Sequence, residues 1–361
     1  MTSAEEKPEA VSLDEVLDEF SEVIELDRGN AFAYESRPPV FANLHDLEES
    51  AEKHAQRVLY RSQALLPKAK MLRISNAKVS WYGTVTPQSG RQILETVPRG
   101  ASVETADVPD DEVSDFSVLL RKYGDGNFGH WLIELCTRVL EFRKAYPSDD
   151  WKVAIPHYPL GRRDLRLRTL KWLGIGQDRV VWIKNGTTRF RDLAFITSNS
   201  VHSHSHDPKG VRFVRDAALN AVGEVGKGRR LFLGRSGAKT RELLNEAEVL
   251  EICARYGFES MRPETLSIDD QVRLFASAEC IVGVSGAALT NILFAPQSCK
   301  ILSLNPNQGP EYFFWDIANI VGQEFSYIFG PASDPERGVH SSFHIDAQLV
   351  ARWLQDHLGA I

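Results

Sequence analysis

The feature that most constrains the fold is a regular alternation of short apolar runs and amphipathic stretches in the second half of the chain. The apolar runs are Leu231–Leu233, a stretch near Glu259–Arg262, Cys280–Val284 and Lys300–Leu304. Stretches with helical spacing separate them, at 245–256, after a capping Ser267 and at 287–294. Parallel strands joined by right-handed helical crossovers produce this order. The sequence therefore predicts an α/β fold with a Rossmann-like, doubly wound sheet at 229–335.

A less regular alternation comes before this region. Strands are expected at 118–120, 152–156, 180–183 and 192–197, and helices at 130–145, 161–173 and 208–223. Residues 71–98 favour a hairpin, because 78–85 alternates and a Pro-Gln-Ser-Gly turn follows. Three glycines at 223, 226 and 228 are typical of a linker. We expect a first domain at 29–222 that is β-rich to about residue 110 and α/β after it.

The two ends of the chain are predicted to be helical. Residues 1–28 hold ten acidic side chains against Lys7 and Arg28, and five apolar residues at helical spacing predict an amphipathic helix within 11–25. These are Leu13, Val16, Leu17, Phe20 and Ile24. Such a helix could dock on the protein or join two copies as a homodimer. A last helix near 346–358 is expected to pack back toward the first domain.

Composition excludes several classes of protein. The net charge of −7 does not fit a nucleic-acid-binding protein, which would be basic. The four cysteines are too far apart for a zinc site, so we expect buried thiols and no metal. The amino terminus lacks the pattern of a signal peptide, and no run of 18 apolar residues occurs. A cytoplasmic protein is expected, with peripheral contact to the inner membrane as an alternative.

The first candidate site is the turn after the strand at 280–284, which reads Ser285-Gly286-Ala287-Ala288-Leu289-Thr290-Asn291. Small residues let a ligand approach the backbone, and the start of a helix offers unpaired N–H groups that suit phosphate. Ligands of open α/β sheets bind at the carboxyl ends of the strands, where this turn lies. A tight turn that serves packing alone is the alternative.

The second candidate is a group of cations just after the strand at 231–233, formed by Arg235, Lys239 and Arg241. They follow a strand of the same predicted sheet, so they belong to the same edge as the Gly286 turn. Arginine offers paired donors and a fixed charge to a diphosphate. Solvated surface charge is the alternative.

The third candidate is Asn127 with His130 and Glu134 at the start of the helix at 130–145. His130 and Glu134 are one helical turn apart, so their side chains can meet. A carboxylate beside an imidazole can act as a general base. An exposed pair on the helix surface is the alternative, and the pattern alone favours it.

These three segments, in this order, resemble the motifs of glycosyltransferase family 61, which includes bacterial capsule and lipopolysaccharide enzymes. Its Asn-x-x-His motif with a later acid matches Asn127, His130 and Glu134. Its arginine after a strand, followed by Arg-x-x-x-Asn-Glu, is similar to Arg235 with Arg241, Asn245 and Glu246. A glutamine in the next helix matches Gln271, and the last motif matches the Ser285–Asn291 turn. The resemblance covers roughly residues 75–330.

The resemblance implies a GT-B architecture, in which two Rossmann-like domains border a cleft. It also implies an inverting, metal-independent transfer from a nucleotide sugar, usually a UDP-sugar, to a glycan or glycolipid acceptor, with no cofactor. Glu134 would be the base, oriented by His130, and Asn127 would lie on the acceptor side. The donor would contact Arg235, Lys239, Arg241, Asn245, Glu246, Gln271, Ser285, Gly286, Ala287, Ala288, Thr290 and Asn291. Two residues depart from the family pattern: Ser285 replaces a histidine and Ala288 replaces a glycine.

Two other functions stay open at this point. One is a different GT-B-like transferase, for example one that moves pyruvyl groups to a polysaccharide. The other is a catalytically silent nucleotide-binding subunit, an interpretation prompted by Ser285.

Three further features of the sequence are interpreted as structural rather than functional. The alternating histidines at 202, 204 and 206 are expected to lie in an exposed loop, and the basic cluster between Arg162 and Lys171 on a solvated helix face. The aromatic run Tyr312–Trp315 is expected in the core.

Overall fold

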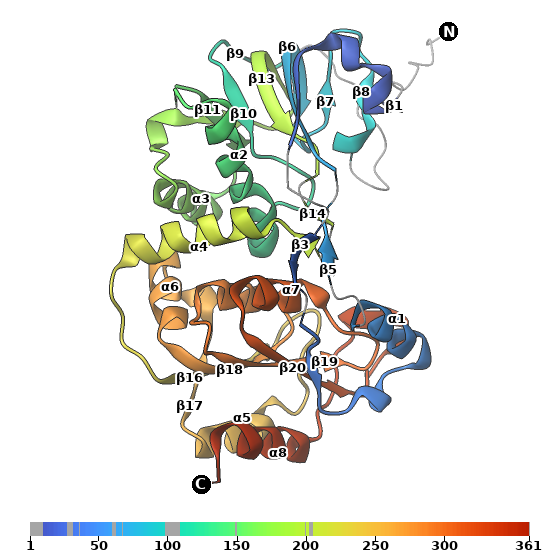
Figure 1. Ribbon diagram of the computed structural model, residues 1–361, viewed down its shortest axis with the longest axis vertical. Helices are drawn as coiled ribbons and strands as arrows, with labels where there is room; N and C mark the ends of the chain where they lie inside the picture. The colour runs from blue at the N-terminus through green and yellow to red at the C-terminus, as the bar shows by residue number, and fades with distance from the viewer. Residues whose placement is uncertain are drawn as a thin grey trace. The chain divides into compact units, whose positions relative to one another are not determined.

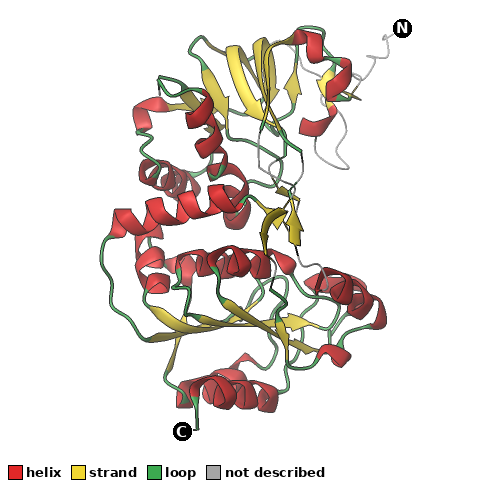
Figure 2. Cartoon of the chain, in the orientation of Figure 1, coloured by secondary structure: helices red, strands yellow, loops and turns green. Residues whose placement is uncertain are grey.

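The computed structural model describes residues 10–26, 32–35, 37–59, 63–66, 68–97, 109–148, 150–198, 200–201 and 205–360. The chain divides into two compact units. The first comprises residues 1–29 and 66–201, and the second comprises residues 30–65 and 202–361. Both units mix helices with strands, which confirms the predicted α/β class (Figure 2).

The first unit contains an eight-stranded mixed sheet. Its strands follow the order β12-β11-β10-β13-β6-β2, with β7 beside β6 and β9 beside β13. Strands β10, β11 and β12 run parallel, whereas β6 is antiparallel to β13. The bounds are β2 Phe20–Glu25, β6 Lys70–Ser80, β7 Val85–Thr86, β9 Asp111–Val113, β10 Ser117–Leu119, β11 Lys152–Pro156, β12 Val180–Ile183 and β13 Thr187–Ile196. The pair β1 (Ala10–Val11) and β8 (Gln92–Ile93) lies outside this sheet, and β14 spans Ser200–Val201.

Residues 71–98 contain a hairpin, in which β7 pairs antiparallel with β6, but its turn lies between Ser80 and Val85. The predicted hairpin across the Pro-Gln-Ser-Gly turn is wrong, because β8, which follows that turn, pairs parallel with β1.

The helix predicted at 130–145 begins as a π-helix. His130–Cys136 has π geometry, and α2 continues from Arg138–Ala145. Helix α3 spans Leu160–Trp172, close to the predicted 161–173. A π-helical segment is rare and is found most often at functional sites. This local geometry therefore supports the choice of the His130 region as a candidate site.

The prediction of an amphipathic helix within 11–25 is wrong. Residues Leu13–Glu15 and Leu17–Glu19 form short 3-10 turns, and Phe20–Glu25 is strand β2, which pairs antiparallel with β6. Phe20 and Ile24 are four residues apart, a spacing that fits one side of a helix and also one face of a strand. Pairing with β6 favours the strand. The amphipathic helix that was expected to join two copies of the chain therefore does not form.

The second unit contains a six-stranded sheet in which every paired strand is parallel. The order is β17-β16-β18-β19-β20-β4. The bounds are β4 Val40–Phe41, β16 Arg229–Leu233, β17 Phe258–Met261, β18 Ala278–Val284, β19 Lys300–Pro306 and β20 Glu324–Gly330. Strands β16 to β20 therefore have the spatial order 2-1-3-4-5, a doubly wound arrangement. This confirms the Rossmann-like sheet predicted from the sequence.

Helices cover both faces of this sheet. In Figure 1, α5 and α8 lie on one face and α4, α6 and α7 on the other. Their bounds are α1 Glu49–Leu59, α4 Pro208–Val222, α5 Glu246–Arg255, α6 Ile268–Ala276, α7 Tyr312–Val321 and α8 Ala347–Leu358. The short strands β3 (Phe32–Glu35) and β5 (Gln63–Leu65) pair with each other, and β15 spans Ser205–His206. Ser267 caps α6 by accepting a hydrogen bond from the Asp270 N–H at 3.2 Å, as predicted.

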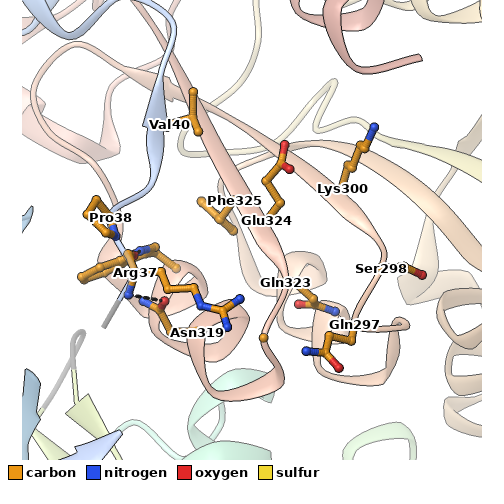
Figure 3. A pocket seen from close by; sticks show the side chains of 12 residues that line it. Arg37, Pro38, Val40, Gln297, Ser298, Lys300, Asn319, Gln323, Glu324 and Phe325 are labelled. Atoms are coloured by element: carbon orange, nitrogen blue, oxygen red, sulfur yellow. Dashed lines mark hydrogen bonds between the residues drawn. The ribbon is translucent and has the colours of Figure 1, made fainter. Parts of the chain in front are cut away.

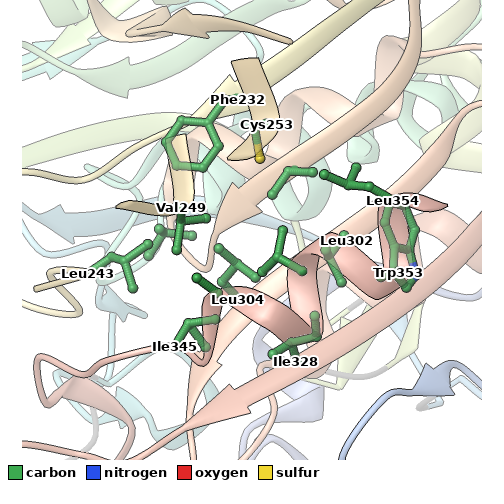
Figure 4. Close-up of a cluster of buried hydrophobic side chains, with 14 of the residues drawn as sticks. Phe232, Leu243, Val249, Cys253, Leu302, Leu304, Ile328, Ile345, Trp353 and Leu354 are labelled. Atoms are coloured by element: carbon green, nitrogen blue, oxygen red, sulfur yellow. The ribbon is translucent and has the colours of Figure 1, made fainter. Parts of the chain in front are cut away.

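Helix α8 belongs to the core of the second unit. Its Val350, Trp353 and Leu354 share a buried cluster with residues of α5 and of strands β16, β18, β19 and β20 (Figure 4). The predicted position of this helix, packed toward the first domain, is therefore wrong. Its apolar stripe faces the sheet because that is where the apolar area can be buried.

Candidate functional site

The doubly wound sheet has one point where the order of its strands reverses. Strand β17 follows β16 on one side, and the chain then returns to place β18 on the other side of β16. The carboxyl ends of β16 and β18 therefore border a crevice, the usual ligand position in this class of sheet. Arg235 follows β16 and Ser285–Gly286 follows β18. The fold brings the first two candidate sites together within the second unit.

Arg235 lies directly against Gly286. A Cβ atom on Gly286 would be only 1.9 Å from the Arg235 Nη1 atom, so only glycine leaves room for this guanidinium. The guanidinium also donates to the Thr240 carbonyl at 3.0 Å. Burial, followed by the positive charge of Arg241, lowers the pKa of Arg235. A guanidinium held against a glycine turn has the charge and the paired donors that suit an anion.

Several buried polar atoms around this turn have no hydrogen-bond partner among the described residues. They are the Nε atoms of Arg235 and Arg241, the hydroxyl oxygens of Ser285 and Thr290, and the side-chain carbonyl oxygen of Asn291. Ser285, Thr290 and Asn291 are fully buried. Buried polar groups are nearly always paired in folded proteins. Their concentration here indicates a place that a polar ligand or water completes.

The segment after Gly286 is a 3-10 helix, Ala287–Phe294, rather than the α-helix expected from the sequence. Helices of this kind also begin with backbone N–H groups that lack a partner within the helix. The start of the segment, at Ala287 and Ala288, is thus suited to a phosphate group.

Other predicted donor residues support this turn from behind. Glu246 accepts a hydrogen bond from the Arg235 backbone N–H at 2.5 Å and fills the space beside Gly234. Gln271 accepts a hydrogen bond from the Asn291 side chain at 3.0 Å, which links α6 to the 3-10 helix. These two residues position the turn.

Asn245, Lys239 and Arg241 have separate surroundings. The Asn245 amide donates to the Ile345 carbonyl and accepts from the Ile345 N–H, so this residue fixes the chain before α8. Lys239 is exposed, and no contact of its side chain connects it with the turn. Arg241 has a positive φ of 55° and a 3.5 Å ion pair with Glu311, a residue that the sequence analysis did not identify. Left-handed backbone at a non-glycine residue is often found at functional sites.

The third candidate site lies in the first unit, and its two central residues do meet. The His130 Nδ1 atom is 2.5 Å from Glu134 Oε1, and Lys122 forms an ion pair with the other carboxylate oxygen of Glu134. The side chain of Glu134 is only 4% exposed, whereas that of His130 is 20% exposed. The pair is therefore not the surface pair that the helical pattern alone favoured.

Arg138 fixes this helix to the sheet. It donates to the Glu134 carbonyl at 3.1 Å and to the Ile196 carbonyl at the end of β13 at 3.0 Å. Asn127 is exposed, and its side chain accepts a hydrogen bond from the Gly129 N–H at 2.8 Å. Asn127 therefore shapes the start of the helix, and its predicted acceptor contact stays a prediction.

A buried ionic network holds the loop that carries Lys122. Asp125 is fully buried, accepts from Arg121 Nη1 and the Tyr158 hydroxyl at 2.5 Å each, and its carbonyl accepts from Arg166. Burial, followed by the charge of Asp125, raises the pKa of Tyr158 to about 12. Arg166 is buried between Trp131 and Tyr158, so the prediction that the basic cluster lies on a solvated helix face is wrong at this residue. The spacing of Asp125, four residues after Arg121, was the signal in the sequence that could have indicated this ion pair.

The histidine loop is described only in part, since positions 202–204 lie outside the described residues. His206 is fully buried, and its Nδ1 atom is 2.6 Å from Asp316 Oδ2. Burial raises the pKa of Asp316. Within the described ranges, no group of three or more His, Cys, Asp or Glu could hold a metal ion.

The aromatic run is buried, as expected: Tyr312, Phe313, Phe314 and Trp315 all lie in the core.

A pocket of about 330 Å³ lies at the amino ends of the strands of the second sheet, opposite to the carboxyl ends that Arg235 and Gly286 follow (Figure 3). It is lined by residues that precede or begin β19 and β20, including Gln297, Lys300 and Gln323. These are the amino ends of the strands. The pocket is therefore separate from the crevice at Arg235 and Gly286, and the position of its residues does not connect it with the predicted donor site.

None of the helices described here is both long enough and apolar enough to cross a lipid bilayer.

Comparison with known proteins agrees with the chemistry of these sites. Residues 128–302 match the family model described as Glycosyltransferase 61. This match spans His130, Glu134, Arg235, Arg241 and the Ser285–Asn291 turn. The match ends within β19 and covers slightly less than half of the chain.

Curated relatives carry transferase names. The chain is 28% identical over 204 residues to protein O-linked-mannose beta-1,4-N-acetylglucosaminyltransferase 2 of Canis lupus familiaris, covering 53% of this chain and 34% of the relative. The protein of the same name from Bos taurus is 31% identical over 209 residues, again 53% of this chain and 34% of the relative. An EGF domain-specific O-linked N-acetylglucosamine transferase of Drosophila melanogaster is 29% identical over 120 residues, 29% of this chain and 22% of the relative. The alignments thus span about a third or less of these animal proteins.

Proposed function

We propose that this chain, whose residues 128–302 match the glycosyltransferase 61 model, transfers a sugar from a nucleotide-sugar donor to a hydroxyl group of a glycan acceptor. The observation that carries the proposal is the contact of the Arg235 guanidinium with Gly286 at the switch point of the parallel sheet. A UDP-sugar is the first donor to test, and N-acetylglucosamine is the first sugar because the relatives are named for it.

The donor diphosphate binds at the Gly286 turn. Its oxygens accept hydrogen bonds from backbone N–H groups at the start of the 3-10 helix and from the guanidinium of Arg235. Arg241 adds a second positive charge near Arg235. These fixed cations stabilise the negative charge that develops on the leaving diphosphate, which a metal ion does in other transferases. The transfer is accordingly metal-independent.

The acceptor hydroxyl is deprotonated at His130. Lys122 and His130 already engage both oxygens of the Glu134 carboxylate, whose side chain is only 4% exposed. The imidazole is more exposed than this carboxylate, at 20%. Glu134 orients the ring through Nδ1, and the opposite nitrogen, Nε2, takes the proton, as in other carboxylate–histidine pairs. This assignment exchanges the roles that the sequence analysis gave to the two residues.

The reaction is a single displacement. The acceptor oxygen attacks the anomeric carbon as its proton passes to His130, and the bond between that carbon and the diphosphate oxygen breaks. The diphosphate leaves with the electron pair. Attack opposite to the leaving group inverts the configuration at the anomeric carbon.

Ser285 occupies the position where the family pattern has histidine. Its hydroxyl can give one hydrogen bond to a phosphate oxygen but adds no charge. The charge at the site then depends on Arg235 and Arg241, which makes Arg235 the residue whose removal is most informative.

A panel of nucleotide sugars tests the proposal. The full chain is incubated with UDP-N-acetylglucosamine, other UDP-sugars and GDP-mannose, with and without EDTA, and thermal stabilisation and donor hydrolysis are measured. We expect at least one donor to raise the melting temperature and to be hydrolysed at the same rate in EDTA. Binding without hydrolysis or transfer would instead favour a silent nucleotide-binding subunit, and no binding of any donor would reject the proposal.

A further inference from the structure

Two exposed tyrosines stand beside the His130–Glu134 pair in the first unit. Tyr82 is 40% exposed and Tyr123 is 59% exposed, which is unusual for large aromatic side chains. Their ring centroids are 6.1 Å apart, with an angle of 43° between the ring planes. We call this pair the tyrosine platform.

The loop that carries Tyr123 also reaches the candidate base. Tyr123 follows Lys122, the ion-pair partner of Glu134, and precedes Gly124, where a Cβ atom would lie 3.9 Å from the Cδ2 atom of His130. The backbone next to Tyr123 therefore lies close to the imidazole. The two rings come from the loop after β10 and the turn after β6.

The turn that carries Tyr82 is fixed against the loop that carries Tyr123. Arg121 Nε donates to the Trp81 carbonyl at 2.6 Å. Gly83 has a φ of +93°, and a Cβ atom there would lie 2.8 Å from Arg121 Cγ. Only glycine allows both this backbone conformation and this close approach. The backbone of the two segments is thus held in place before any ligand arrives, which lowers the entropy lost on binding.

We propose that the tyrosine platform is the acceptor subsite and that it binds a pyranose ring of the glycan. A pyranose presents a face of C–H groups that packs on aromatic rings, while its hydroxyl groups stay available to polar neighbours. Lys122, which precedes Tyr123 in the chain, and His130, which lies against Gly124, are such neighbours. This inference rests on the proposed transferase function, because the platform has meaning as a subsite only beside a base that acts on a hydroxyl.

The test uses methyl pyranosides as probes: the methyl glycosides of mannose, glucose, galactose and xylose, with mannitol as an acyclic control. Binding to the full chain is followed by saturation-transfer NMR and titration. We expect at least one pyranoside to bind through its C–H protons and mannitol not to bind. Tyr123→Ala should weaken that binding about tenfold, in the range expected for loss of an aromatic contact. Tyr123→Phe should retain it, since the ring face is the contact.

Leu94→Ala is the matched control, since Leu94 is a large apolar residue of the same unit that is 53% exposed and lies outside the platform. UDP affinity and thermal unfolding of every variant show whether the protein remains folded. The inference is overturned if no pyranoside binds, if Tyr123→Ala binds as tightly as the wild type, or if that variant changes only the oligomeric state. Failure of the donor panel would instead reject the transferase function itself, so the two failures are distinguishable.

Discussion

The chemistry of the acceptor side depends on how His130 and Lys122 share the carboxylate of Glu134. The side chains of His130 and Lys122 are 20% and 28% exposed, whereas that of Glu134 between them is only 4% exposed. A carboxylate placed this way controls the orientation and charge of the ring rather than the proton transfer itself. The proposed roles therefore follow from burial and charge.

Replacing Glu134 by glutamine should abolish this control. We expect Glu134→Gln to bind UDP as the wild type does and to lower the transfer rate by about 10²- to 10⁴-fold, because His130 then loses the carboxylate that orients it as a general base. Calorimetric titration with UDP and steady-state kinetics measure the two effects. Glu141→Gln, on the same helix, is the control, and a Glu134→Gln enzyme of normal activity would remove the pair from the mechanism.

The sequence pointed to the residues at the centre of both candidate sites but not to those that hold them in place. Residue type and spacing singled out Arg235, Gly286, His130 and Glu134. Arg121, Asp125 and Tyr158 are distant in sequence or of unremarkable type, and only the fold shows that they share one buried network. Asn245 looked like a donor residue, whereas its amide fixes the backbone of Ile345.

At the scale of elements, the four strands predicted for the second sheet form close to their predicted places, whereas β4, β20 and α7 were not predicted. Nearly continuous apolar strands such as 280–284 have few alternatives in a chain of this length. The type of helix, which is set by the spacing of its backbone hydrogen bonds, was not predictable in the same way. His130–Cys136 is a π-helix and Ala287–Phe294 is a 3-10 helix, because tertiary contacts rather than local preference set these geometries. The strand at Phe20–Glu25 exists because β6 offers it a partner.

Helix α8 provides a prediction about stability. Leu354 is fully buried among residues of the second sheet, so Leu354→Ala should lower the free energy of unfolding by about 2–5 kcal/mol, the usual cost of such a cavity. Urea unfolding followed by tryptophan fluorescence measures the loss. Leu358→Ala is the control, since that side chain is only partly buried and should cost clearly less. Equal, small effects of both changes would contradict the packing of α8 on this sheet.

At the scale of the whole molecule, each unit contains its own sheet and its own candidate site. The chain enters the second unit at residue 30, leaves it at 65 and returns at 202. Because β4 from the early segment pairs with β20, the sheet that carries Arg235 and Gly286 is completed by residues far earlier in the sequence. The division of the chain near the glycines at 223–228, expected from composition, does not reveal this connection.

The reactivity of the four cysteines is a measure of how well both units are packed. All four are buried and free. Burial raises the pKa of Cys136, Cys253 and Cys280 to about 12, and that of Cys299 in the same direction. A raised pKa leaves little reactive thiolate at pH 8. Ellman's reagent should therefore modify essentially none of them in the native protein and all four in guanidinium chloride. Rapid reaction of a native thiol would show that its unit opens easily.

The central claim is that a nucleotide diphosphate binds where Arg235 meets Gly286, and calorimetric titration with UDP tests it most directly. Arg235→Ala should weaken binding by about 1.5–3 kcal/mol, the usual value of a charged hydrogen bond. Arg229→Ala is the control, because Arg229 begins β16, the strand that Arg235 follows, and pairs with Glu259 on the surface; this variant should bind as the wild type does. Equal UDP affinity of the wild type and Arg235→Ala would contradict the account.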